Sequence, residues 1–277
     1  MSVAVVGFCR FSFLGRGDWP EYRSIPIGEE ADYYEDIAAN LFDPDRMERR
    51  LWTFENITIP SIKAQTDKNF TYVVLASDVM PAIYQQRLIE ICANIPQVTV
   101  IFSEKRNLGD VIKPVLADLW DTHDDVVQFR LDDDDAIAIN YVEKVHDYAR
   151  RLAGIGAFAI TMTRGLTAVI SRKEPLWYAF YNRPFQSAAS IIRFANRDRT
   201  VFDVGHYAMQ QRYTHIQDVQ TCGSFMLQWP SASRNETLAN IPSDWEKVGR
   251  HRFLRRCEES FPFLADVNFE HLRDQLD

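Results

Sequence analysis

Short apolar runs rich in β-branched residues alternate with helical patterns through the first half of the chain, and this alternation restricts the fold most strongly. The predicted strands span residues 3–8, 70–76, 98–102 and 126–131, and the predicted helices span residues 43–57, 81–92 and 107–120. Parallel strands need a crossover connection, which is usually a helix. We therefore predict an α/β fold with a mostly parallel central sheet flanked by helices.

Charged residues stand at or just after the carboxyl end of each predicted strand. They are Arg10, Asp78, the segment 104–106 and the segment 132–135. Ligands of open α/β sheets bind beyond the carboxyl ends of the strands. We therefore expect these side chains to converge on one crevice.

The second half of the chain is less regular. Residues 157–163 and 166–171 read as two strands, and Arg164-Gly165 between them predicts a hairpin turn. Residues 15–30 read as a long surface loop. A basic cluster at 250–256 reads as the solvated face of a helix, with contact to an anionic membrane or an acceptor phosphate as the alternative. No linker composition stands out, so we predict a single domain over 1–277.

Charge and cysteine content exclude several classes of protein. The formal net charge is −8, which argues against a dedicated nucleic-acid binder. No run approaches the roughly 20 apolar residues of a membrane span, and residues 3–9 lack the flanks of a signal peptide. We therefore expect a cytoplasmic protein. Neither a zinc site nor a dense disulfide framework fits the spacing of the cysteines, which are Cys9, Cys92, Cys222 and Cys257.

The acidic run Asp132-Asp133-Asp134-Asp135 is the strongest chemical signal. Four adjacent carboxylates raise one another's pKa and cost stability unless a cation compensates them. Mg²⁺ and Mn²⁺ prefer oxygen ligands, so either ion is the expected cofactor. While the strand persists, Asp132 and Asp134 share one face, and Asp133 and Asp135 share the other.

Other interpretations of this run stay open. It could be a solvated acidic turn. An EF-hand loop fits poorly, because Ile137 stands at the glycine position. A Mg²⁺-dependent phosphohydrolase could use Asp132 and Asp134 as nucleophile and acid, although Ala136 stands where that motif has Thr or Val. The Asp-x-Asp of nucleotide-sugar transferases is the interpretation we favour.

Further segments extend this resemblance. The chain resembles GT-A glycosyltransferases and, more closely, the putative rhamnosyltransferase family of bacterial proteins. The matching pieces are Arg10-Phe11-Ser12, residues 46–54, Ile59-Pro60-Ser61, Gln65-Thr66-Asp67, Ser77-Asp78 with Pro81, and residues 130–136. The resemblance covers most of residues 3–140 and, more loosely, 200–240.

The resemblance implies a Rossmann-like GT-A fold and metal-dependent transfer of a sugar to a glycan or small-molecule acceptor. The donor would be a dTDP-, UDP- or GDP-linked sugar, and the family name suggests rhamnose. Residues 1–140 would form the nucleotide-sugar-binding half and residues 141–277 the acceptor-side half. A degenerate GT-A domain that binds without catalysis is a further alternative.

The resemblance and the strand ends together give candidate site residues. Those for donor binding are Arg10, Asp78, Arg106, Arg130, Asp132 and Asp133. Those for the metal are Asp132, Asp134, Asp135 and His206. An inverting transfer needs a carboxylate that deprotonates the acceptor, and Asp218 and then Asp203 are the candidates, although each could instead be a capping or solvent-facing residue. One departure concerns Leu227-Gln228, which Trp229 follows where the family has a nearby histidine.

Overall fold

The computed structural model describes residues 2–15, 33–172, 174–186, 189–229 and 242–274. The loop predicted at 15–30 and the segment 230–235 lie almost entirely outside the described residues. The strands are β1 (Val3–Arg10), β2 (Thr71–Ser77), β3 (Val98–Ser103), β4 (Asp125–Arg130), β5 (Ala136–Ile137), β6 (Phe158–Val169), β7 (Trp177–Asn182), β8 (Ile191–Arg193), β9 (Thr214–Gln228) and β10 (Trp245–Val248).

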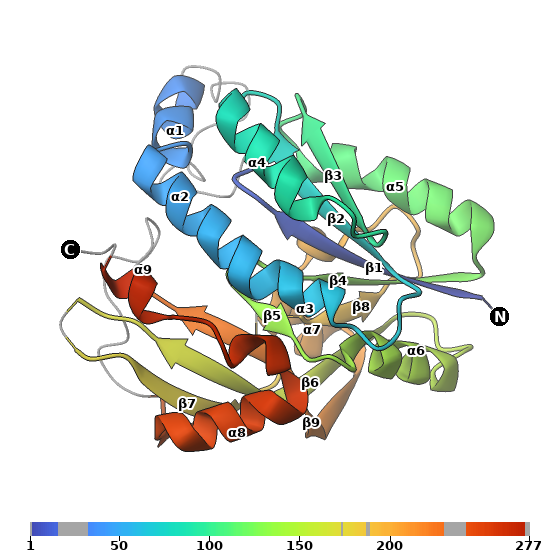
Figure 1. Cartoon of the computed structure of the whole chain (residues 1–277). Coiled ribbons are helices and arrows are strands. Elements are labelled where there is room, and N and C mark those ends of the chain that lie inside the picture. Colours follow the sequence, from blue (N-terminus) through green and yellow to red (C-terminus); the bar gives the residue numbers. More distant parts are fainter. Residues whose placement is uncertain (1, 16–32, 173, 187–188, 230–241, 275–277) are drawn as a thin grey trace.

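Helices cover the sheet on both sides (Figure 1). The α-helices are α1 (Tyr34–Leu41), α2 (Pro44–Thr53), α3 (Ile59–Lys63), α4 (Ala82–Cys92), α5 (Leu108–Thr122), α6 (Tyr141–Arg151), α7 (His206–Arg212), α8 (Arg250–Ser260) and α9 (Glu270–Asp274). A π-helical turn, η3 (Phe54–Thr58), joins α2 to α3, and the short 3₁₀ turns are η4 (Val201–Asp203) and η5 (Pro262–Leu264). None of the described helices is long and apolar enough to cross a membrane.

The first-half strands form the parallel part of the sheet that the sequence predicts. In the described chain the strand order is β10-β7-β6-β8-β4-β1-β2-β3, and β1 pairs in parallel with both β2 and β4. The second half extends the sheet through antiparallel pairings of β8, β6, β7 and β10, while β9 runs parallel to β6. The α/β architecture is confirmed, and the parallel pairings of β1, β2, β3 and β4 lie in the half where the sequence predicts them.

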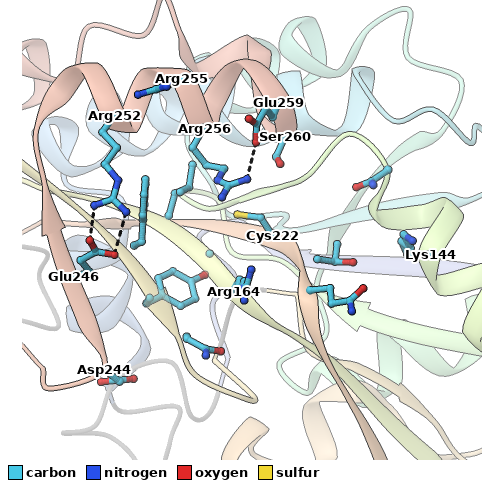
Figure 2. Close-up of a pocket in the computed structure, with 18 residues that line it drawn as sticks. Lys144, Arg164, Cys222, Asp244, Glu246, Arg252, Arg255, Arg256, Glu259 and Ser260 are labelled. Atoms are coloured by element: carbon cyan, nitrogen blue, oxygen red, sulfur yellow. Dashed lines mark hydrogen bonds and ion pairs between the residues drawn. The ribbon is translucent and has the colours of Figure 1, made fainter.

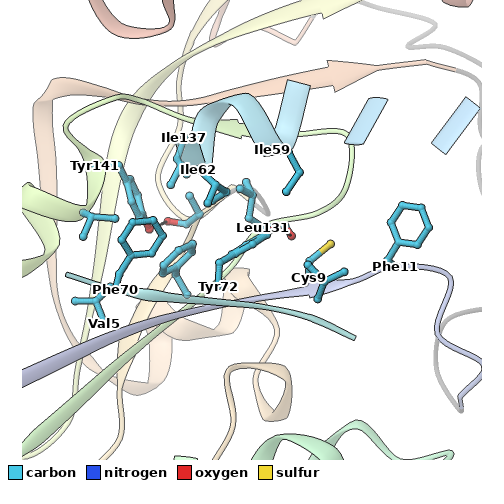
Figure 3. Close-up of a cluster of buried hydrophobic side chains, with 14 of the residues drawn as sticks. Val5, Cys9, Phe11, Ile59, Ile62, Phe70, Tyr72, Leu131, Ile137 and Tyr141 are labelled. Atoms are coloured by element: carbon cyan, nitrogen blue, oxygen red, sulfur yellow. Dashed lines mark hydrogen bonds between the residues drawn. The ribbon is translucent and has the colours of Figure 1, made fainter. Parts of the chain in front are cut away.

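Alternate residues of the parallel strands enter two separate cores. Val5 of β1 belongs to a cluster with side chains of α2, α3, α4 and α6 on one face, whereas Val6 belongs to a cluster with side chains of α5 and α7 on the other. Figure 3 shows Val5 in the first cluster, together with Ile59 and Ile62 of α3 and Tyr141 of α6. β1, β2 and β4 are buried on both faces and therefore read as continuous apolar runs, whereas the edge strand β3 is only partly buried. The Asp43 side chain accepts from the Arg46 backbone N–H at 3.0 Å and begins α2, as the sequence predicts.

The predicted hairpin at Arg164-Gly165 is wrong, because β6 runs without interruption from Phe158 to Val169. A Cβ atom on Gly165 would lie 2.1 Å from the Tyr181 hydroxyl oxygen. The glycine is therefore needed for the close approach of β7, not for a turn. β6 pairs with β7, β8 and β9, and α8 packs against one face of this part of the sheet (Figure 1).

Candidate functional site

The acidic run forms a turn between β4 and β5 at the carboxyl edge of the parallel strands. The Asp135 backbone N–H donates to the Asp132 carbonyl oxygen at 3.3 Å and closes the turn. Asp133 and Asp135 are buried, with 4% and 5% exposed, whereas Asp132 and Asp134 are half-buried. The alternation that the sequence predicts therefore persists beyond the end of the strand.

Three of the four carboxylates have a partner in the described part of the chain. The Arg50 guanidinium donates to Asp133 Oδ1 at 2.7 Å, and the Trp229 indole N–H donates to Asp134 Oδ2 at 2.9 Å. Asp135 Oδ1 accepts from the Leu227 backbone N–H at 3.3 Å. The structure gives the Asp132 side chain no hydrogen bond or ion pair to the described residues.

Burial and mutual repulsion raise the pKa of the carboxyl groups in this turn. The pKa of Asp134 is raised to about 7. Burial is the largest cause and the charges of Asp133 and Asp132 act in the same direction, whereas the hydrogen bond from Trp229 lowers the pKa. Burial and then the charge of Asp134 raise the pKa of Asp135 well above its ordinary value. Burial also raises the pKa of Asp133, against the attraction of Arg50. A cation beside the turn would relieve this penalty.

Basic side chains face the turn from the ends of β1 and β4. Arg130 Nη2 lies 2.6 Å from His206 Nδ1. The pKa of Arg130 is lowered by burial, supported by the nearby charge of Arg10 and opposed by that of Asp132. The structure thus brings Arg10, Arg130 and Asp132 together, as predicted from their positions at the strand ends, and it places His206, the first residue of α7, beside Arg130.

His206 does not fit the predicted role of metal ligand. Burial, and then the charge of Arg130, lower the pKa of His206 to about 4, so the ring is neutral at pH 7. Arg130 can only donate, so Nδ1 accepts its hydrogen bond and the ring proton lies on Nε2. In this arrangement the Nε2–H group donates a hydrogen bond, and binding a metal through Nε2 would require the proton to move to Nδ1 and the contact with Arg130 to break. His206 is therefore suited to an anionic ligand.

A second charged pair lies farther along the same edge. Arg106 Nη1 contacts Asp78 Oδ1 at 3.3 Å, after the ends of β3 and β2. Two strand spacings separate β2 from β4, which corresponds to about 10 Å. The predicted donor-binding residues therefore line one edge of the sheet.

Both candidate bases, Asp203 and Asp218, accept hydrogen bonds within the protein. Asp203 closes a capping box with Thr200, accepting from its backbone N–H at 2.9 Å. Asp218 accepts from the Tyr148 hydroxyl at 2.8 Å and from the backbone N–H groups of Gln220 and Thr221.

Asp218 also lies far from the acidic turn. It pairs with Met162, whereas Leu227, which contacts the turn, pairs with Ala168. Six residues of β6 separate these two positions, which corresponds to about 20 Å. Both carboxylates are thus engaged in local structure, which is the capping alternative that the sequence left open.

The turn fits a metal that is shared with a ligand more closely than one held by protein alone. Within the residues described, no group of three or more His, Cys, Asp or Glu side chains comes together to hold an ion. Mg²⁺ is commonly bound by one or two carboxylates together with substrate phosphates. Asp132 and Asp134 are both half-buried, and the charge of Asp132 contributes to the raised pKa of Asp134, so they are the pair that could do this. The buried Asp133 Oδ2 has no hydrogen-bond partner among the residues that the structure describes.

Sequence reasoning missed two residues of this site. Arg50 lies three positions after Met47 and four before Phe54, so it is a charge on the buried face of its helix. That placement was a detectable signal. Trp229 contacts Asp134 from 95 residues away, and only its position just after β9 connects it with the site.

Comparison with known families gives one match by sequence. The profile of a family described as "putative rhamnosyl transferase" matches residues 4–237. No curated protein matches the chain by sequence.

Solved structures with a similar arrangement include nucleotide-sugar enzymes. S. aureus TarS is 11% identical, with a TM-score of 0.42, over 83% of this chain and 37% of TarS. TarS 1–349 in complex with UDP is 12% identical, with a TM-score of 0.41, over 83% of this chain and 61% of that one. A putative nucleotide-diphospho-sugar transferase from Desulfovibrio desulfuricans G20 is 10% identical, with a TM-score of 0.38, over 83% of each chain. The chain thus spans little more than a third of the TarS structure.

Proposed function

The chain belongs to the putative rhamnosyl transferase family, and on that basis we propose that it transfers a sugar from a nucleoside diphosphate donor to an acceptor hydroxyl. The observation that carries the proposal is the placement of the acidic turn beside Arg130 and His206 at the carboxyl edge of β1 and β4. A diphosphate bridged to a divalent cation needs both kinds of group. Rhamnose is the sugar that the family description suggests.

The basic side of the site would hold the donor diphosphate. Arginine binds phosphate oxygens through two parallel N–H groups, and in the described part of the chain the buried Nε of Arg130 has no hydrogen-bond partner. The Nε2–H of a neutral His206 adds a donor without adding a charge. Arg10 lies close enough to Arg130 to reach the same group. These donors would stabilise the charge that develops on the leaving nucleoside diphosphate.

The acidic side of the site would share Mg²⁺ or Mn²⁺ with the diphosphate. Asp132 and Asp134 are the proposed ligands, while Arg50 and the backbone of Leu227 hold the two buried carboxylates in place. When bound, the cation would act as a Lewis acid and offset the negative charge of the leaving group. The raised pKa of Asp134 supports this proposal, since a nearby cation would favour its ionised form.

Asp78 and Arg106 would lie beside the nucleoside. Their ion pair is about 10 Å from β4 along the edge, a distance that a nucleotide can span. Asp78 is 42% exposed and can accept hydrogen bonds from a base or ribose. The dTDP-, UDP- and GDP-linked sugars remain alternative donors.

Titration calorimetry with UDP, GDP and dTDP, each with and without Mn²⁺, tests the proposal. We expect one nucleotide to bind in a Mn²⁺-dependent manner and its sugar conjugate to be turned over. Failure of all three to bind would overturn the proposal. Release of phosphate from p-nitrophenyl phosphate would instead favour the phosphohydrolase alternative.

Variants locate the binding site. Asp132→Asn and Arg130→Gln should each weaken nucleotide binding about tenfold or more, since each removes a charged contact. Asp147→Asn is the matched control, because this aspartate is exposed on α6 and pairs only with Arg150 among the described residues. Equal affinity of all three variants would show that the nucleotide binds elsewhere.

A further inference from the structure

A second cavity, separate from the acidic turn, lies between α8 and the strands β6, β7 and β9. Its volume is about 770 Å³, within the range of small-molecule sites. Its charged lining residues are Lys144, Arg164, Arg252, Arg255, Arg256, Asp244, Glu246 and Glu259. Five cations thus face three anions in a protein whose formal net charge is −8. The cavity is therefore a positive region on an acidic molecule.

The three anions of this cavity are already paired. Glu246 binds Arg252, Glu259 binds Arg256 at 2.6 Å, and Asp244 binds Arg183. The structure shows no ion pair or hydrogen bond from the side chains of Lys144 and Arg164 to the described residues. Figure 2 shows Arg164 in the middle of the cavity, with Lys144 toward one end and the Arg252–Glu246 pair toward the other. The positive charges of Lys144 and Arg164 are therefore available to a ligand.

Uncharged groups of the lining suit a saccharide. Hydroxyl and amide side chains line the same cavity as Arg164 and Lys144, and they belong to Asn140, Asn182, Gln220, Thr221 and Ser260. Phe180 and Leu166 add apolar surface. Such a mixture can bind the hydroxyls and the C–H faces of a sugar, while Arg164 and Lys144 bind an anionic substituent.

We propose that this cavity is a second ligand site, which binds a saccharide that carries phosphate or carboxylate groups. Arg164 shares its face of β6 with Leu166 and Ala168, and both pack in one apolar cluster with Ala136, next to Asp135. Four residues of β6 separate Arg164 from Ala168, the partner of Leu227, which corresponds to about 13 Å. If the proposed transfer function holds, the saccharide is the acceptor, but binding to the cavity does not depend on that function.

Calorimetry in metal-free buffer tests the proposal with two anionic probes and a neutral one. The probes are tripolyphosphate, trigalacturonate and maltotriose, each titrated into the unaltered protein and into the Arg130→Gln variant of the donor site. We expect at least one anion, and not maltotriose, to bind both proteins with equal affinity. Binding of tripolyphosphate alone identifies phosphate as the preferred group, and binding of trigalacturonate alone identifies carboxylate.

Variants assign that binding to the cavity. Arg164→Gln and Lys144→Gln should each weaken it about tenfold, and Arg130→Gln should leave it unchanged. Arg150→Gln is the matched control, since Arg150 is exposed on the same helix as Lys144 but outside the cavity. Binding of neither anion, or equal affinity of Arg164→Gln and the control, would overturn the proposal. The proposed function fails separately, if no nucleotide binds.

Discussion

Replacing Arg50 by methionine is expected to lower the free energy of unfolding by about 3–5 kcal/mol, because a buried ion pair loses one partner. Asp133 is 4% exposed, and Arg50 lies 2.7 Å from its Oδ1 atom. Among the described residues Oδ2 is buried with no hydrogen-bond partner, so the variant leaves a buried carboxylate without its ion-pair partner, and Arg46 remains as a nearby positive charge. That loss is comparable with the roughly 5–15 kcal/mol by which folded proteins are stable.

The converse change should cost less. Asp133→Asn removes the charge, while Arg50 keeps the Arg10 carbonyl oxygen at 3.3 Å and a side chain that is 20% exposed. We expect a loss of about 1–3 kcal/mol. The double variant should lose less than the sum of the single losses, by about 0.5–3 kcal/mol, since neither partner then remains as an isolated charge.

Urea unfolding at pH 7, followed by circular dichroism, measures all three variants. Arg87→Met is the control, because its ion pair with Glu48 is exposed and should contribute at most about 1 kcal/mol. The reasoning is refuted if Arg50→Met costs no more than Arg87→Met, or if the two single losses are additive.

Three further predictions concern the metal, His206 and Asp218. Chelation with EDTA should weaken nucleotide binding about tenfold or more, and MnCl₂ should restore the affinity, both measured by calorimetry. Equal nucleotide affinity with and without EDTA would contradict a cation shared between the turn and the nucleotide. Arg130→Gln should raise the pKa of His206 above about 4 in an NMR titration, because part of its depression comes from the Arg130 charge; an unchanged pKa would count against their contact. Burial raises the pKa of Asp218, but hydrogen bonds from Thr221 and Gln220 outweigh burial and lower the pKa overall. Asp218 therefore stabilises the fold at pH values above its pKa in the unfolded chain, and this stabilisation is lost as the pH falls through its pKa in the folded protein. Asp218→Asn should therefore cost about 1–2 kcal/mol in urea unfolding at pH 7 and less at pH 3, with nucleotide affinity unchanged; loss of that affinity would contradict the placement of Asp218 away from the acidic turn.

The parallel part of the sheet could be predicted because local sequence determines it. Strands such as β1 and β2 are buried on both faces and therefore read as apolar runs between polar ends. The error at Gly165 has a different origin. Gly165 is required because the Tyr181 side chain of the neighbouring strand β7 leaves no room for a Cβ atom. A contact between strands leaves no pattern in the local sequence.

In the candidate site, only the residues at the strand ends could be predicted from local sequence. Asp132–Asp135, Arg10 and Arg130 follow strand ends, and the parallel topology brings strand ends to one edge. The partners that decide what each carboxylate can do come from distant segments, with Arg50 83 residues and Trp229 95 residues away. Asp218 illustrates the opposite case, since its position in the sequence does not show that β9 separates it from Leu227 and the acidic turn.

The distribution of partners over the acidic turn limits how many carboxylates can serve a cation. Arg50 compensates Asp133, and burial favours the protonated form of Asp135. Asp132 and Asp134 remain on the half-buried face, and the Trp229 hydrogen bond favours ionisation of Asp134 without adding a charge. Two carboxylates are few for a metal held by protein alone, but they suit one whose other ligands are phosphate oxygens. Metal and nucleotide should therefore bind cooperatively, and Mn²⁺ alone should bind more weakly than Mn²⁺ with the nucleotide present.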